Sequence, residues 1–531
     1  MRLTRHVRLF DRFDLRAASV QASPARGLPA TCVPMESRPS FTLPMAGSGP
    51  AALWALLIAY LVLAGPFSTK RAVCGQSVGI HVSESAEETV VRITVSPAGE
   101  PRPALKYQLL PPYLERMRGN AAVYYGKAAA YGRDFLSDSK LMEAADEWTR
   151  ASLKDLRGPS ARQSPAFQRI DADSLFWTLL DQAARYRDCD WQLPLKKQPV
   201  WWIPLPDAQQ SRTFARLLAA RARLRIAQGR FDDAIRTLQS GYALSRHVAQ
   251  GETLIQGLIG GAICGMMSHQ VLELIQQPGA PNLYWALTML PRPFVDLRDA
   301  IETEMNAVYV AFPVLTELDD DTHGAEYWRD SLFQLAQELE QADYSDGRAT
   351  LRPELLLARA IRAYPRAKRA LIDSGLSRER VEAMPVARVL LYYTKQTYEE
   401  IRDELFKWSF ARYSETRRCR GLHERLPRLS LDREVVPLAR VLLPAVQGAC
   451  EAAVRQDREI AVLRTIEALR MYAANHKGRL PEKLTDLTVP IPLDPVTGQP
   501  FQYQRRENAA VIQGPTFRSM VLNVEVTVSK P

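Results

Sequence analysis

The chain has 531 residues, of which 46% are hydrophobic and 24% charged, and its formal net charge is +10. These proportions are those of an ordinary globular protein, and the length allows two to four domains of about 100–200 residues each. Six cysteines without any CxxC pair argue against a zinc ribbon and against a dense disulfide scaffold. The basic residues form no nucleic-acid-binding motif with aromatic residues, so we expect no nucleic-acid partner.

The N-terminal region predicts where in the cell the protein is located. Residues 1–50 are rich in Arg, Ser and Pro and predict a disordered tail, whereas residues 51–67 (AALWALLIAYLVLAGPF) carry no charge. A membrane span needs about 20 apolar residues and a signal-peptide core about 7–15, so this segment fits a transmembrane anchor or a signal peptide. Val62 and Ala64 are suitably placed for cleavage before Gly65. The arginines before the segment favour an inside N-terminus. We therefore expect a single-pass membrane protein with an extracytoplasmic body, or a periplasmic or secreted protein if the segment is cleaved.

The next segments predict a short β segment at 78–98 and then a long helical body. Residues 78–96 alternate and are rich in β-branched residues, which is typical of one or two strands. From 104 to 439 most segments have apolar residues at i, i+3 and i+4. We expect this body to be all-α.

Residues 211–249 predict two helices joined at Gln228-Gly229-Arg230. Small and large residues around the turn (Gly229, Phe231, Ala234 and Leu238) resemble those of a tetratricopeptide-type hairpin. No second copy follows at the repeat spacing of about 34 residues. The resemblance implies one TPR-like hairpin within an irregular helical body.

Two further stretches of the body have alternative interpretations. Residues 188–206 contain four prolines and three tryptophans, Trp191, Trp201 and Trp202. We expect this loop to cover neighbouring helices, although exposed tryptophans can also stack on sugars or anchor a partner. In the following helix Gly257, Gly261 and Gly265 share one face and permit close helix packing. Its apolar part is about a dozen residues long, which predicts a buried core helix rather than a second span.

The sequence contains no HExxH, GxSxG, P-loop or dinucleotide-binding motif. His247 near Glu252, and His269 near Glu273, could each form an acid–base or metal-binding pair, but structural histidines are commoner.

Asp319, Asp320, Asp321 and His323 could hold a divalent cation, but they lack the glycine and the ligand spacing of a calcium loop. We therefore interpret the run as a solvated loop and assign no catalytic, cofactor-binding or metal residue. Residues 352–428 have an excess of basic residues, which could contact phospholipid headgroups or an acidic partner, or could form a solvated helix face.

Residues 440–515 predict a C-terminal module with a long amphipathic helix over 440–475, a stop at Gly478, and two strands near 501–504 and 509–513. This stretch resembles the type II secretion pseudopilins. The matching residues are Leu443-Pro444-Ala445-Val446-Gln447, Glu451-Ala452-Ala453, Ala468-Leu469, Tyr472, Gly478, Leu480, Pro481, Leu484, Asp494-Pro495, Gly498, Pro500 and Tyr503. The sequence before Arg440 is not the apolar half-helix through which pseudopilins assemble. The resemblance therefore implies a related module, without pilus assembly and without metal ligands.

Over most of the exported part, the chain resembles a family of bacterial exported or membrane-anchored helical proteins that carries no assigned activity. The segments that resemble this family are residues 104–125, 220–235, 278–298 and 478–503.

The sequence supports two hypotheses about function. The first is an extracytoplasmic helical scaffold that binds protein partners and contacts the membrane through residues 51–67. The alternative is a cell-envelope enzyme of the hydrolase type, with a dispersed site that includes His247, Glu252, His269 and the 319–323 run. Convergence of these side chains in space would favour the enzyme.

Overall fold

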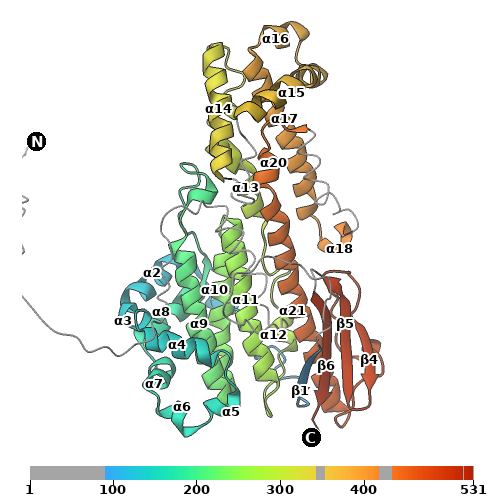
Figure 1. Ribbon diagram of the computed structural model, residues 1–531. Coiled ribbons are helices and arrows are strands. Elements are labelled where there is room, and N and C mark those ends of the chain that lie inside the picture. The colour runs from blue at the N-terminus through green and yellow to red at the C-terminus, as the bar shows by residue number, and fades with distance from the viewer. Residues whose placement is uncertain (1–89, 343–352, 418–432, 518–519, 530–531) are drawn as a thin grey trace, which may run out of the picture. The chain divides into compact units, whose positions relative to one another are not determined.

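The computed structural model describes residues 90–342, 353–417, 433–517 and 520–529. The expected tail and apolar segment (1–50 and 51–67) lie outside these residues. The described chain is mainly helical with a small C-terminal mixed sheet, as the sequence predicts. Figure 1 shows the order of the elements.

The first half of the helical body consists of short helices followed by three long ones. The short helices are α2 (Ala121–Tyr131), α3 (Arg133–Leu136), α4 (Ser139–Trp148), α5 (Leu153–Leu156), α6 (Pro159–Gln163), α7 (Pro165–Asp171) and α8 (Leu175–Ala184). The long helices are α9 (Pro206–Ala227), α10 (Phe231–Ala249) and α11 (Leu254–Ile275).

The second half of the body leads into the long C-terminal helix. Its helices are α12 (Tyr284–Thr288), α13 (Arg298–Ala311), α14 (Ala325–Ala342), α15 (Pro353–Asp373), α16 (Arg378–Ala383), α17 (Val386–Phe406), α18 (Tyr413–Thr416), α20 (Leu438–Leu442) and α21 (Pro444–Asn475). Pro444 stands at the first position of α21, where a missing N–H costs nothing, and the predicted single helix is therefore divided into α20 and α21.

A four-stranded sheet joins the two ends of the described chain. Its strand order is β1 (Val91–Val95), β6 (Met520–Val528), β5 (Ala509–Phe517), β4 (Gln502–Arg506). β4, β5 and β6 pair antiparallel, while β1 lies parallel to β6 with Val91 opposite Val524. The sequence predicted β1 and the β4–β5 hairpin but not β6. The expected C-terminal hairpin is therefore part of a larger sheet.

A second, two-stranded parallel sheet interrupts the helical body. It pairs β2 (Met117–Asn120) with β3 (Tyr186–Asp188). The expectation of an all-α body was wrong at this point, because both strands are too short to show a period in the sequence.

Helices α9, α10 and α11 pack against one another, and α11 also packs against α21. α11 is long and apolar enough to cross a membrane, but 78% of its apolar window is buried, so its composition is weak evidence for a span. Its closest approach to α10 is at Gly260, where an added Cβ would lie 2.6 Å from the backbone N of Ala249. The glycines of the predicted face meet side chains instead: Gly257 faces Leu297, and Gly261 faces Gln456.

The tryptophan-containing loop covers the helices in part. The Trp191 indole N–H donates to the carbonyl of His247 at 3.1 Å, and its ring stacks on Tyr125. Trp202 is 66% exposed. The covering role predicted for this loop is therefore confirmed for Trp191, whereas Trp202 remains at the surface.

A buried ion pair ties α21 to distant segments. Glu467 and Arg470 are fully buried and lie 2.8 Å apart. The Arg470 guanidinium also donates to the carbonyl oxygens of Ser96, just after β1, and Ala280, each at 2.9 Å. These hydrogen bonds hold the end of β1 and the loop around residue 280 to α21. Removing either charge would leave the other buried without its partner, which is strongly destabilising.

Candidate functional site

The turn between α9 and α10 is set by its local sequence. Gly229 has φ +75°, a conformation that side chains disfavour, and it follows the last turn of α9. The N–H of Arg230 donates to the carbonyl of Arg225 at 2.9 Å, and that of Gly229 to Ile226 at 3.0 Å. These two bonds form a Schellman motif, which ends α9 and directs the chain back along it as α10.

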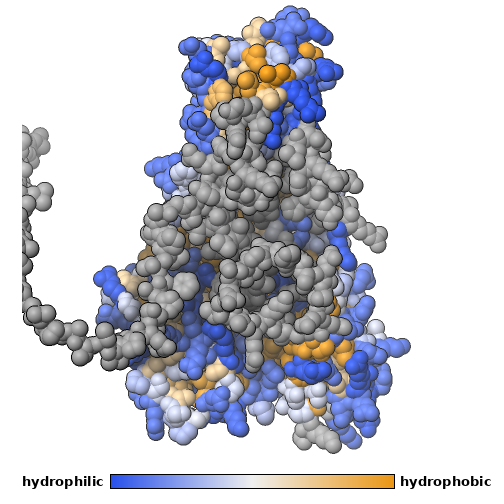
Figure 2. Space-filling view, viewed as in Figure 1, coloured by the Kyte–Doolittle hydropathy of each residue, from blue (hydrophilic) through white to orange (hydrophobic). Residues whose placement is uncertain are grey.

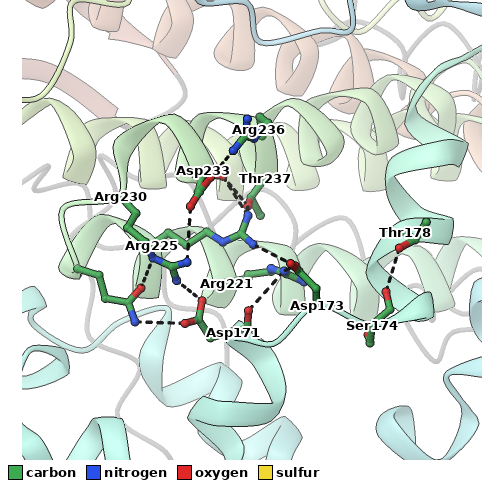
Figure 3. A network of polar contacts seen from close by, with 11 residues as sticks. Asp171, Asp173, Ser174, Thr178, Arg221, Arg225, Arg230, Asp233, Arg236 and Thr237 are labelled. Atoms are coloured by element: carbon green, nitrogen blue, oxygen red, sulfur yellow. Dashed lines mark hydrogen bonds and ion pairs between the residues drawn. The ribbon is translucent and has the colours of Figure 1, made fainter.

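Arginines and aspartates gather at this turn (Figure 3). The cationic residues are Arg221 and Arg225 on α9, Arg230 in the turn and Arg236 on α10; the acidic residues are Asp171, Asp173 and Asp233. We call these seven residues the arginine–aspartate cluster. It carries one more positive than negative charge, since four arginines face three aspartates.

Arg221 is the most deeply buried member of the cluster. It is 3% exposed, and its guanidinium lies 4.3 Å from the centre of the Trp177 ring. Its Nη2 donates to Asp173 Oδ1 at 2.7 Å, whereas Nε and Nη1 have no acceptor among the described residues. Burial, together with the nearby Arg225, lowers the pKa of Arg221 to about 10. Arg221 is therefore still a cation at neutral pH, with two N–H groups that lack a partner.

Arg225 connects the two helices of the hairpin. Its Nη1 donates to Thr237 Oγ1 at 2.7 Å and to the carbonyl of Asp233 at 3.1 Å. Its Nη2 lies 3.8 Å from Asp173 Oδ1, and its Nε has no acceptor in the described part of the chain. Burial is also the main cause that lowers the pKa of Arg225.

Asp173 lies at the surface between these two arginines, 2.7 Å from Arg221 and 3.8 Å from Arg225. It belongs to the link between α7 and α8, and its side chain is 96% exposed while that of Arg221 is 4% exposed. An exposed carboxylate forms weak, solvent-screened ion pairs, so little free energy opposes its replacement. A carboxylate or phosphate from another molecule that replaced Asp173 would meet the Nη2 groups of Arg221 and Arg225, which are cationic donors.

His247 is a structural residue. Its Nε2 lies 2.9 Å from the carbonyl of Tyr186 and therefore donates to it, so Nδ1 accepts from the Tyr125 hydroxyl at 2.9 Å. Burial lowers the pKa of His247 to about 4. Both ring nitrogens are engaged and the ring is neutral, so the structure favours the core-histidine interpretation over pairing with Glu252.

His269 lies in a different environment, on α11. Glu273 raises its pKa and Arg223 lowers it, while burial, the largest effect, lowers it. Arg223 itself pairs with Glu273 at 3.3 Å. This carboxylate is therefore already neutralised by an arginine from α9.

The acidic run at 319–323 is engaged in ion pairs. Asp319 accepts from Arg380 at 3.1 Å and from the Tyr392 hydroxyl, and Asp321 lies 2.7 Å from Arg388. His323 lies 3.5 Å from Asp320 and stacks on Tyr327. The run thus joins α16 and α17. Within the residues that the structure describes, no group of three or more His, Cys, Asp or Glu could hold a metal ion.

His247, His269 and the 319–323 run therefore have three separate sets of partners, and no contact among the described residues brings them together. No family model, curated protein or solved structure matches the chain.

The sequence analysis did not predict the arginine–aspartate cluster, and it did not predict the buried polar residues of α21. α21 was expected to be amphipathic, yet Gln456 and Glu459 are 3% and 4% exposed and face Gly265 of α11. Both carboxylate oxygens of Glu459 lack a hydrogen-bond donor among the described residues. Burial raises the pKa of Glu459 to about 7, against the opposing effect of Arg455. The run Arg455–Glu459, polar on every face of a helix, was the available signal.

Proposed function

We propose that this chain is a membrane-anchored or exported extracytoplasmic scaffold that binds an acidic segment of a partner protein at the arginine–aspartate cluster. The observation that carries the proposal is the pair of cations on α9, the buried Arg221 and the half-buried Arg225, which share the exposed carboxylate of Asp173. The Nη2 groups of Arg221 and Arg225, which face the exposed Asp173, are the donors that an incoming anion would meet.

Three sequence features add support. The sequence of the α9–α10 hairpin resembles a tetratricopeptide hairpin, and in such repeats stacked hairpins form protein-binding surfaces. The C-terminal module resembles pseudopilins, and the chain resembles a family of exported bacterial proteins. Together with the apolar segment 51–67, these features favour an envelope protein whose role is assembly with other proteins.

The proposal is tested with the detergent-solubilised full chain and a fluorescent hexaglutamate peptide, whose binding is measured by fluorescence polarisation. A hexaglutamine peptide is the uncharged control. We expect hexaglutamate to bind, Arg225→Gln to abolish binding, and Arg133→Gln to leave it unchanged. Arg133 serves as the control because it is exposed on α3, outside the cluster.

The decisive variant is Asp173→Asn. It removes the internal carboxylate that competes with the peptide. A competing exposed ion pair contributes about 1 kcal/mol at most, so affinity should rise by up to about fivefold. Equal binding by wild type, Asp173→Asn and Arg225→Gln would show that the cluster is structural and would reject the proposal.

A further inference from the structure

Helix α15 (Pro353–Asp373) has one buried face and one apolar exposed stripe. Ala363, Ala367 and Leu371 are at most 5% exposed, and α15 packs on α17. On another face Leu357 and Ile361, four residues apart, are 57% and 68% exposed. Figure 2 shows hydrophobic side chains over the α14–α16 region, surrounded by hydrophilic ones. These two neighbouring aliphatic side chains offer apolar surface whose burial against another surface would be favourable.

Arginines follow one flank of this stripe. At 100° per residue, Arg369 continues the line formed by Leu357, Ile361 and Pro365, and Arg362 lies beside it. Arg366 lies farther round the helix, where its guanidinium packs on Tyr393. Arg362 and Arg369 are exposed, and neither forms an ion pair with a described residue. α15 as a whole contains five basic residues (Arg359, Arg362, Arg366, Lys368 and Arg369) and two acidic ones (Glu354 and Asp373). We call the exposed stripe and its arginine flank the α15 face.

We propose that the α15 face docks on an anionic phospholipid surface. Leucine and isoleucine on a basic amphipathic helix enter the boundary between headgroups and acyl chains, and their arginine neighbours extend to the phosphates. Each arginine near an anionic leaflet strengthens the attraction. An acidic protein segment would satisfy the arginines but would leave Leu357 and Ile361 in water, so the combination of both features favours lipid. This inference is independent of the arginine–aspartate cluster.

The test uses the full chain in nanodiscs, so that segment 51–67 is accommodated equally in every sample. A genetically encoded environment-sensitive fluorophore replaces Ala358, an exposed residue beside the stripe. The same fluorophore at the exposed Lys140 of α4 is the control position. The lipid is either neutral phosphatidylcholine or the same lipid with about one third phosphatidylglycerol, an anionic fraction large enough to attract basic segments. Lipids brominated in the acyl chain serve as quenchers.

We expect the fluorophore at 358, but not at 140, to shift to the blue and to be quenched in the anionic nanodiscs only. Arg362→Glu with Arg369→Glu should lower the ratio of docked to undocked protein by at least about tenfold, since each arginine contributes about fivefold. Leu357→Ser with Ile361→Ser should remove quenching while the charge is kept. The matched variant Arg133→Glu with Arg162→Glu makes the same change in charge on α3 and α6 and should behave as wild type.

Three results would overturn the inference. The first is the same emission in neutral and anionic nanodiscs. The second is a loss of quenching in the matched charge variant as large as in Arg362→Glu with Arg369→Glu. That result would show that docking depends on the net charge of the protein and not on the α15 face. The third is a blue shift caused by added polyglutamate and not by anionic lipid, which would assign the face to an acidic protein. Circular dichroism and thermal melting of each variant separate these results from misfolding.

Discussion

Arg221 and Asp173 form an ion pair of 2.7 Å in which the cation is buried and the anion is almost fully exposed. The carboxylate can leave this pair for solvent at little cost, whereas the guanidinium cannot. The pair is therefore asymmetric, and its two sides should respond differently to substitution.

This asymmetry is tested by a double-mutant cycle on stability. We expect Asp173→Asn to lower the free energy of unfolding of the wild type, because it leaves Arg221 and Arg225 facing each other. In the Arg221→Met background the same change should have little effect, giving a coupling energy of about 1 kcal/mol. Chemical denaturation measures all four proteins, with Asp134→Asn as the exposed control. A coupling energy of zero would mean that Asp173 does not neutralise Arg221.

The buried carboxyl of Glu459 predicts a pH dependence of stability. Its pKa is raised from 4.5 to about 7 by burial, and Arg455, Tyr242 and Cys264 are the titratable groups that interact with it. Between pH 4.5 and 7 the unfolded chain loses this proton and the folded chain keeps it. Stability should therefore fall as pH rises through this window, by about 3 kcal/mol from this group.

Glu459→Gln removes this titration and should make the pH profile flatter, with the largest gain in stability over wild type above pH 7. Denaturant unfolding at several pH values measures it. Glu147→Gln, a change at an exposed residue of α4, is the control. If Glu459→Gln had the same profile as wild type, the carboxyl would be ionised in the fold.

Two adjacent glycines of α11 should respond in opposite ways to alanine. A Cβ at Gly260 would lie 2.5–2.7 Å from atoms of Ala249, two of which are backbone atoms that cannot move aside. Gly260→Ala should destabilise by about 1–3 kcal/mol or more. A Cβ at Gly261 would meet Gln456 Cγ at 3.5 Å, an ordinary contact. Gly261→Ala should be neutral or stabilising by up to about 1 kcal/mol, through helix propensity. Thermal melting of both variants tests this prediction. An equal loss of stability in the two variants would contradict the close approach at Gly260.

The predicted membrane topology is tested by fusing reporter proteins to the C-terminus. If residues 51–67 lead the chain through the membrane, an alkaline phosphatase fusion should be active and a fluorescent-protein fusion dark. Leu57→Arg with Leu61→Arg should reverse both readouts, because each central arginine costs about 2.5–3.5 kcal/mol on insertion. A bright fluorescent fusion of the unaltered chain would refute the predicted topology.

Much of the helical architecture was predictable because its signals are local. Gly229 ends α9 through its own backbone conformation and the two hydrogen bonds beside it, so a few neighbouring residues specify the hairpin. The apolar composition of 254–275 likewise predicts a helix, but the same composition fits a membrane span, and the packing of neighbouring elements decides that α11 is buried.

The C-terminal sheet and the buried charged residues could not be predicted, because they depend on segments that are far apart in the chain. β1 pairs with β6, with Val91 opposite Val524, and such pairing leaves no mark in either segment alone. Arg221 and Glu459 are of residue types that usually lie at the surface, yet helix packing buries both of them. The choice of Gly260 over Gly261 as the point of closest approach is likewise set by where α10 crosses α11. The sequence by itself determined where helices begin and turn, because capping and periodicity act between neighbouring residues. Only the tertiary structure decided which charged side chains lost their water, because burial depends on which distant elements pack together.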